Sequence, residues 1–248
     1  MENGIVGRDA LVNLRRGDWP PLVIGHRGAA AIAPENTLEG LQAAVDAGAH
    51  LVEFDIGPDL RLAHSPREAS EGAVTLDAAL EFLYEHALGV QLDIKQPGYE
   101  DVVVATLRRH GLEERAIVST AFAVSARRLA ILAPALPRAI GYPRDTYGVA
   151  RFQWPEQLTR LGAAALRQVT PLRVPPLLRA ARANVLSLHH SLCSRAAVRV
   201  AHTRGAPVLA WTANDPATVR RLSALGVDAI VSDDPGMVLR TLATLREQ

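Results

Sequence analysis

The sequence has one cysteine, Cys193, among 248 residues. A single thiol excludes an intramolecular disulfide, and this sparing use of cysteine favours a cytoplasmic location. The first 21 residues lack the apolar core of a secretory signal. No apolar run approaches the roughly 18 residues that a membrane-spanning helix requires. The sequence therefore predicts a cytoplasmic protein with no integral membrane segment.

Net charge is also small, at +1 for the whole chain. Nucleic-acid binding requires a clustered basic face, and the near balance of charges gives no reason to expect one. The basic positions are interpreted as spread along the chain and mostly balanced by acids, so a polybasic membrane patch is not expected either. A small molecule is the predicted partner, and no sequence feature fixes the oligomeric state.

What the chain does have is a regular alternation of short apolar runs with helical patterns, typical of parallel strands covered on both faces. A length of 248 residues with 48% hydrophobic content suits a single (β/α)8 barrel. We expect an N-terminal extension over residues 1–20 and one barrel domain over 21–248. The expected strands are Leu22–Gly25, Leu51–Ile56, Gly89–Lys95, Ala116–Thr120, Arg138–Tyr142, Ala183–Leu188, Pro207–Thr212 and Ala229–Ser232.

Local signals place the expected helices between these strands. Ser125, Ser194 and Asp215 are interpreted as helix N-caps, because their side-chain oxygens can accept from the first free backbone N–H groups. The stretch 143–182 is the least regular, and its prolines are expected to interrupt any single helix there; they are Pro171, Pro175 and Pro176.

Polar side chains gather where the expected strands end, which is the edge that carries the active site in such barrels. Residues two apart on a strand share a face, so each of the pairs Glu53 with Asp55 and Asp93 with Lys95 projects to one side. The other polar groups at this edge are His26, Arg27, His64, Trp211, Asn214, Asp233 and Asp234.

These residue types suit metal-assisted attack on a phosphate ester. Three carboxylates without a nearby cysteine favour a hard divalent cation, Mg²⁺ or Ca²⁺; they are Glu53, Asp55 and Asp93. Arg27 and Lys95 would bind the phosphate, and His26 and His64 would serve as general acid and base.

Simpler interpretations exist for several of these residues. Asp93 and Lys95 could form a plain ion pair, and Trp211 could be core rather than part of a substrate pocket. Asp233 and Asp234 are expected chiefly to cap the last helix, which begins near Pro235.

The chain resembles the glycerophosphodiester phosphodiesterase family over about residues 22–240. The resemblance rests on His26-Arg27-Gly28, Pro34-Glu35-Asn36-Thr37, Gly48-Ala49, Glu53-Phe54-Asp55, His64, Asp93-Ile94-Lys95, Trp211-Thr212-Ala213-Asn214 and Gly226-Val227-Asp228-Ala229-Ile230. It implies a (β/α)8 barrel that uses a divalent metal to hydrolyse glycerophosphodiesters to an alcohol and glycerol 3-phosphate. It also implies that His26 and His64 act as acid and base, that Glu53 and Asp55 bind the metal, and that Arg27 and Lys95 bind phosphate.

The chain departs from the family pattern in three places. Gly57-Pro58-Asp59-Leu60 replaces a longer hairpin, Ser65 follows the second histidine in place of Asp, and Asp93 stands where Glu is usual. These departures favour one alternative, a barrel that binds phosphodiesters without turnover. A second alternative keeps the same site, with His26 driving attack by a substrate hydroxyl that releases a cyclic phosphate.

Overall fold

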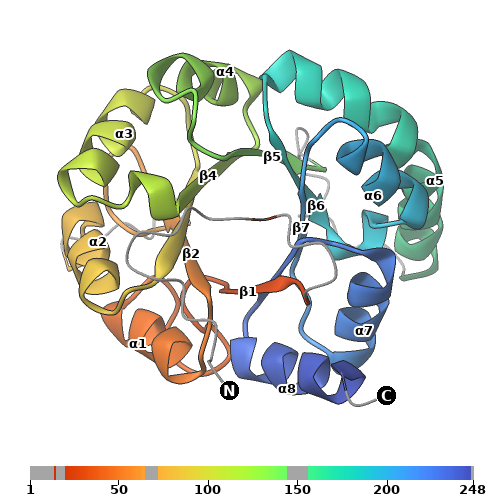
Figure 1. Ribbon diagram of the computed structural model, residues 1–248, viewed down its shortest axis with the longest axis horizontal. Helices are drawn as coiled ribbons and strands as arrows, with labels where there is room; N and C mark the ends of the chain where they lie inside the picture. The colour runs from red at the N-terminus through yellow and green to blue at the C-terminus, as the bar shows by residue number, and fades with distance from the viewer. Residues whose placement is uncertain (1–13, 15–19, 65–71, 144–155, 247–248) are drawn as a thin grey trace.

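The computed structural model describes residues 14, 20–64, 72–143 and 156–246. Within these residues, eight parallel strands pair in sequence order and close into a barrel, with β1 bonded to β8. The helices surround the barrel on its outside (Figure 1). The predicted single-domain (β/α)8 barrel is therefore confirmed. The extension predicted for residues 1–20 lies outside the described residues except for Leu14 and Pro20.

The strands agree closely with those expected from the apolar runs, with differences of one or two residues at three of them. They are β1 Leu22–Gly25, β2 Leu51–Ile56, β3 Gly89–Ile94, β4 Ala116–Thr120, β5 Arg138–Tyr142, β6 Val185–His189, β7 Val208–Trp211 and β8 Ala229–Ser232.

The helices follow the strands in alternation, with short 3-10 turns at Glu113–Arg115 and His190–Leu192. Ser194 and Asp215 cap their helices as predicted. Ser125 does not, because its helix begins two residues earlier and buries it. The helices are α1 Leu38–Asp46, α2 Leu76–Glu85, α3 Glu100–Arg109, α4 Ala123–Leu132, α5 Glu156–Ala181, α6 Arg195–His202, α7 Pro216–Leu225 and α8 Pro235–Arg246.

The expectation that prolines interrupt any single helix in 143–182 is wrong, because α5 runs through all three of them. One face of α5 is fully covered, with Thr170, Val174, Leu178 and Ala181 buried at helical spacing. The prolines lie off this stripe, since Pro176 is exposed and Pro171 and Pro175 are partly exposed. Burial of the apolar stripe therefore outweighs the lost backbone hydrogen bonds.

Alternate residues of each strand point into the barrel and form two kinds of layer. The lower interior is apolar and includes Leu22, Leu51 and Leu209, with Leu14 packed among them. On β2 and β3, the inward positions two residues further along are polar, namely Glu53 and Gln91. These polar side chains lie nearer the carboxyl ends of their strands than the apolar layer does.

Close backbone contact holds the first loop against α1. Gly28 has φ +94, and a Cβ there would lie 2.4 Å from the carbonyl carbon of Gly40. Gly40 in turn lies against the Pro34 carbonyl oxygen, which a Cβ would approach to 2.5 Å. Only glycine permits this approach, which fixes the loop that carries His26 and Arg27.

We expect Gly28→Ala to lower the free energy of unfolding by roughly 2–4 kcal/mol, because the added methyl group meets backbone and the positive φ is strained. Urea unfolding measures this change. The matched control is Gly205→Ala, at φ +72 with no atom within 4 Å of the added Cβ, which should cost about 1 kcal/mol. Equal losses in the two variants would contradict the packing argument.

Candidate active site

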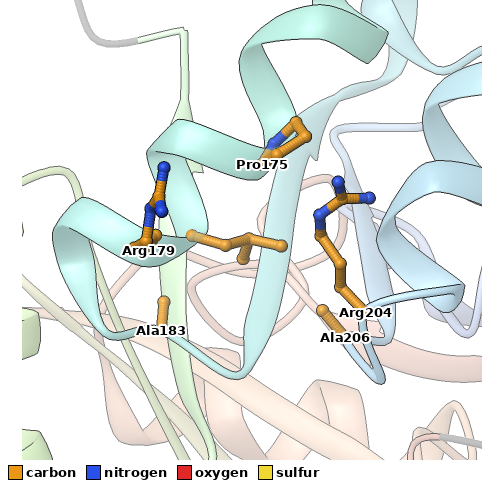
Figure 2. A pocket seen from close by; sticks show the side chains of 6 residues that line it. Pro175, Arg179, Ala183, Arg204 and Ala206 are labelled. Carbon is orange, nitrogen blue, oxygen red and sulfur yellow. The ribbon is translucent and has the colours of Figure 1, made fainter.

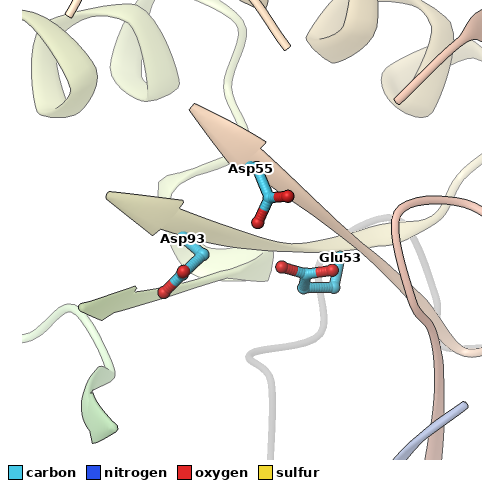
Figure 3. A group of neighbouring side chains, drawn as sticks. All are labelled: Glu53, Asp55 and Asp93. Atoms are coloured by element: carbon cyan, nitrogen blue, oxygen red, sulfur yellow. The ribbon is translucent and has the colours of Figure 1, made fainter. Parts of the chain in front are cut away.

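Three acidic side chains meet at the carboxyl ends of β2 and β3. Glu53, Asp55 and Asp93 each offer a carboxylate oxygen, and these oxygens lie within 4.8 Å of one another (Figure 3). Register places Asp55 directly beside Asp93 on the neighbouring strand. Glu53 and Asp55 are buried, at 4% and 1% exposure. Although an aspartate side chain is one methylene shorter than that of glutamate, Asp93 brings an oxygen into the cluster.

Asp55 is surrounded by cationic groups. Its Oδ2 lies 2.9 Å from Nε of Arg27, and its Oδ1 lies 2.5 Å from Nζ of Lys95. His64 Nδ1 lies 3.2 Å from the same Oδ2. Lys95 also lies 2.5 Å from Oδ2 of Asp93, so it bridges two members of the cluster. The ion pair between Asp93 and Lys95 is thus real, but it belongs to the candidate site.

The loop before α1 holds Asp55 in position. The side chain of Asn36 accepts from the backbone N–H of Asp55 at 3.2 Å and donates to its carboxylate at 3.4 Å. The backbone N–H of Asn36 donates to the carbonyl of Arg27 at 3.0 Å. Thr37 caps α1 by accepting from Gly40. The Pro34–Thr37 motif therefore positions Asp55 as well as starting a helix.

His26 is held by a residue from the last strand. Its Nδ1 lies 2.5 Å from Oδ1 of Asp233, and the other oxygen of Asp233 accepts from the amide of Asn214. Asn214 Oδ1 accepts from the backbone N–H of Asp233 at 3.0 Å. The opposite ring atom, Nε2, faces Glu53 at 4.0 Å. Asp233 is therefore a positioning residue for His26, which the sequence interpretation missed.

Asp234, by contrast, caps the last helix as predicted, since its Oδ1 accepts from the backbone N–H of Met237 at 2.8 Å. The two adjacent acids thus have different tasks. The sequence position of Asp233 could have indicated this role. It lies two residues beyond Val231, whose side chain points into the barrel.

His64 reaches the cluster despite the short segment before it. Leu62 forms an isolated bridge with Ile56 and is buried at 2% exposure. Two residues on, His64 contacts Asp55 and also lies 2.9 Å from Nη2 of Arg27. Its side chain is 48% exposed. The two histidines therefore approach the carboxylates from different segments, one half-buried and one open to water.

Electrostatics separates the two carboxyls of β2. Burial, together with the charge of Asp55, raises the pKa of Glu53 to about 7. Burial acts in the same direction on Asp55, but His64, Lys95 and Arg27 hold its pKa well below the usual range. Burial opposes the charge of Lys95, yet the carboxylates raise its pKa above the ordinary value. Asp55 thus has arginine and lysine against its carboxylate, whereas the His26 ring lies 4.0 Å from Glu53.

The other predicted residues also lie at this end of the barrel. Nη1 of Arg27 donates to Glu35 at 2.8 Å, and the Arg27 backbone N–H donates to Glu53 at 2.9 Å. Trp211 ends β7, where its ring meets His189 edge-on with centroids 5.1 Å apart. It is partly exposed, so its assignment to a substrate pocket stays a prediction.

The sequence matches the profile of the glycerophosphoryl diester phosphodiesterase family over residues 26–57 and 64–237. The chain belongs to this family. The match covers the carboxylate cluster, both histidines and Asp233, and it leaves out residues 58–63, where the short segment before His64 lies. The protein is therefore an enzyme, a glycerophosphodiester phosphodiesterase.

Named relatives support the assignment. YhdW of Bacillus subtilis (strain 168) is 25% identical over 257 residues, covering 88% of this chain and 96% of that protein. A glycerophosphodiester phosphodiesterase of Caldanaerobacter subterraneus subsp. tengcongensis is 23% identical over 254 residues, covering 86% of this chain and 94% of that protein.

The fold is shared with solved structures. An Oleispira antarctica phosphodiesterase, solved in complex with the product sn-glycerol-3-phosphate, has a TM-score of 0.69 at 21% identity, covering 90% of this chain and 97% of that one. Of the helices that the structure describes here, none combines the length and apolarity needed to cross a membrane.

The contact between Asp233 and His26 predicts a measurable change in the histidine. Burial lowers the pKa of His26, but Asp233 and Glu53 raise it above its ordinary value. Asp233→Asn removes one of these charges, so we expect the pKa of His26 to fall, as followed by NMR titration of the ring. Asp234→Asn is the matched control, since Asn still caps the helix. An unchanged pKa in Asp233→Asn would contradict the assignment.

Cation binding at the carboxylate cluster should depend on pH. A cation binds the ionised carboxylate, so affinity should fall as pH is lowered through about 7, the pKa of Glu53. Glu53→Gln should weaken binding by at least roughly tenfold and flatten this pH dependence. Calorimetric titration with Mg²⁺ and with Ca²⁺ measures both effects. The control is Asp101→Asn, an exposed acid on α3; equal affinity in the two variants would refute a site at Glu53.

Proposed function

We propose that this enzyme hydrolyses glycerophosphodiesters to an alcohol and glycerol 3-phosphate with the help of a divalent cation, Mg²⁺ or Ca²⁺. The observation that supports it most directly is the cluster of three carboxylates flanked by two cationic side chains and two histidines. The solved Oleispira antarctica phosphodiesterase holds sn-glycerol-3-phosphate, the product that we propose for this enzyme.

The donor set fits such a cation. Glu53, Asp55 and Asp93 offer only oxygen atoms, which hard divalent cations prefer. Glu53 is buried beside another carboxylate, and a cation there would relieve that repulsion. When bound, the cation would neutralise charge on the phosphate and polarise its phosphorus. The three carboxylates are the residues that would hold it.

Phosphate binding falls to Arg27 and Lys95. Arg27 has a planar fork that matches two phosphate oxygens, and Lys95 supplies a compact charge. Both already lie at the carboxylate cluster, where Asp55 holds them. A phosphodiester held there would sit between the histidines. Trp211, at the same mouth, would line the pocket for the rest of the substrate.

The histidines carry the protons. The oxygen of a water molecule forms a bond to phosphorus while the bond from phosphorus to the alcohol oxygen breaks. His26 accepts the proton that the water loses, since Asp233 stabilises the resulting imidazolium. His64, the more exposed ring, donates the proton that the departing alcohol takes up. Each transfer is typically worth ~10²–10⁴-fold in rate.

The test is release of product from glycerophosphocholine and glycerophosphoethanolamine, followed by phosphorus NMR with Mg²⁺, Ca²⁺ or a chelator. We expect glycerol 3-phosphate with a cation and none with the chelator. His26→Ala and His64→Ala should each lose roughly 10²-fold or more in kcat. The control is His86→Ala, an exposed histidine at the end of α2.

Two outcomes would contradict this proposal. Accumulation of a cyclic phosphate would show attack by a substrate hydroxyl in place of water. No turnover with either cation, while calorimetry shows the cation bound, would support a barrel that binds phosphodiesters without cleaving them.

A further inference from the structure

Arginines are concentrated in one part of the chain. Residues 157–214 contain eight arginines and no lysine, aspartate or glutamate. The whole chain has 27 basic and 26 acidic residues, so the rest has 19 against 26. Less than a quarter of the sequence therefore carries +8, and the remainder carries −7. The interpretation of the basic positions as spread along the chain and mostly balanced by acids is wrong for this stretch.

Folding brings these arginines to one side of the molecule. The stretch forms most of α5, then β6, α6 and β7, and the two helices lie side by side outside the barrel (Figure 1). In the described part of the chain, none of the exposed arginines here has a carboxylate partner. We call them the basic face: Arg173, Arg179, Arg182, Arg195, Arg199 and Arg204.

Apolar side chains are exposed among these charges. Leu172 is 78% exposed and Val169 is 39% exposed, both on the outer face of α5. At 100° per residue, these two lie within an arc of roughly 120° that also holds Arg173 and Arg179. A helix surface that mixes exposed aliphatic side chains with arginine and lacks acids is typical of helices that lie on lipid.

A hollow of about 400 Å³ lies beside the end of α5. Arg179 and Arg204 flank it, and Leu178, Ala183 and Ala206 contribute apolar lining (Figure 2). A second hollow, of about 510 Å³, lies across α6 and includes Arg195 and Arg199. Neither has an acidic residue in its lining. Two guanidinium groups over an apolar floor suit a phosphate that is joined to an apolar chain.

We propose that the basic face docks on the surface of a membrane that contains anionic phospholipid. The uncompensated arginines supply the attraction to anionic headgroups. Leu172 and Val169 supply apolar contact, which would strengthen binding to lipid but not to a nucleic acid. The first hollow lies at the opposite end of the barrel from the carboxylate cluster. Docking would therefore leave the candidate active site open to water, and it does not depend on the proposed reaction.

Vesicle flotation of the full chain tests this docking. We expect binding to vesicles of phosphatidylcholine with 30% phosphatidylglycerol, little binding to phosphatidylcholine alone, and loss in roughly 0.5 M salt. Replacing three arginines by Gln should weaken binding roughly 100-fold, about fivefold for each charge. The changes are Arg179→Gln, Arg199→Gln and Arg204→Gln.

Matched variants separate this effect from a general loss of charge. Arg109, Arg128 and Arg240 are exposed arginines elsewhere, and their replacement by Gln removes the same charge and should leave vesicle binding within about threefold. Leu172→Gln should weaken vesicle binding about tenfold, whereas Val102→Gln on α3 should not. Circular dichroism and cleavage of a soluble substrate confirm that each variant is folded.

Several results would overturn the proposal. They are absence of binding to anionic vesicles at low salt, equal binding to neutral vesicles, and equal loss in the two arginine triples. Tight binding of duplex DNA or RNA that Leu172→Gln leaves unchanged, with weak binding to vesicles, would identify the basic face as a nucleic-acid site.

Discussion

The buried carboxylate of Asp55 is the constraint on which the site depends. An isolated charge at 1% exposure would be very costly, and Asp55 keeps its charge because Arg27 from the loop after β1 and Lys95 from the end of β3 lie against it. His64 from the loop after β2 and Asn36 from the loop that also carries Arg27 complete the surroundings. One side chain therefore brings four segments together, and the groups that neutralise it are those that a phosphate would require.

Burial has a different consequence for Glu53 than for Asp55. It shares a strand face with Asp55, but the cations gather around Asp55, so the two acids differ widely in pKa. The cluster is thus short of positive charge at Glu53 while Lys95 already bridges Asp55 and Asp93. A cation held by the three acids would take up part of the charge that Lys95 and Arg27 now neutralise. Those two side chains would then be better able to hold a phosphate.

Sequence reasoning succeeded where the determinant is local. Alternation along a strand was enough to place Glu53 with Asp55 on one face, and apolar runs gave the strands nearly residue by residue. It failed where closure of the barrel decides. Asp233 lies 207 residues from His26, and only the pairing of β8 with β1 brings them together. The prolines of α5 were misjudged for a related reason, because burial of Val174 against the barrel is a tertiary effect that propensity does not contain.

The same distinction explains how a net charge of +1 concealed two strongly charged regions. Composition averages over the chain, whereas a barrel sorts its elements around an axis, so acids on β2 and β3 and arginines on α5 and α6 end up on different sides (Figure 1). None of the cationic groups that contact Asp55 comes from α5 or α6. The arginines there are therefore not needed to balance the carboxylate cluster. Six uncompensated exposed charges repel one another, and that repulsion falls when an anionic surface lies against them.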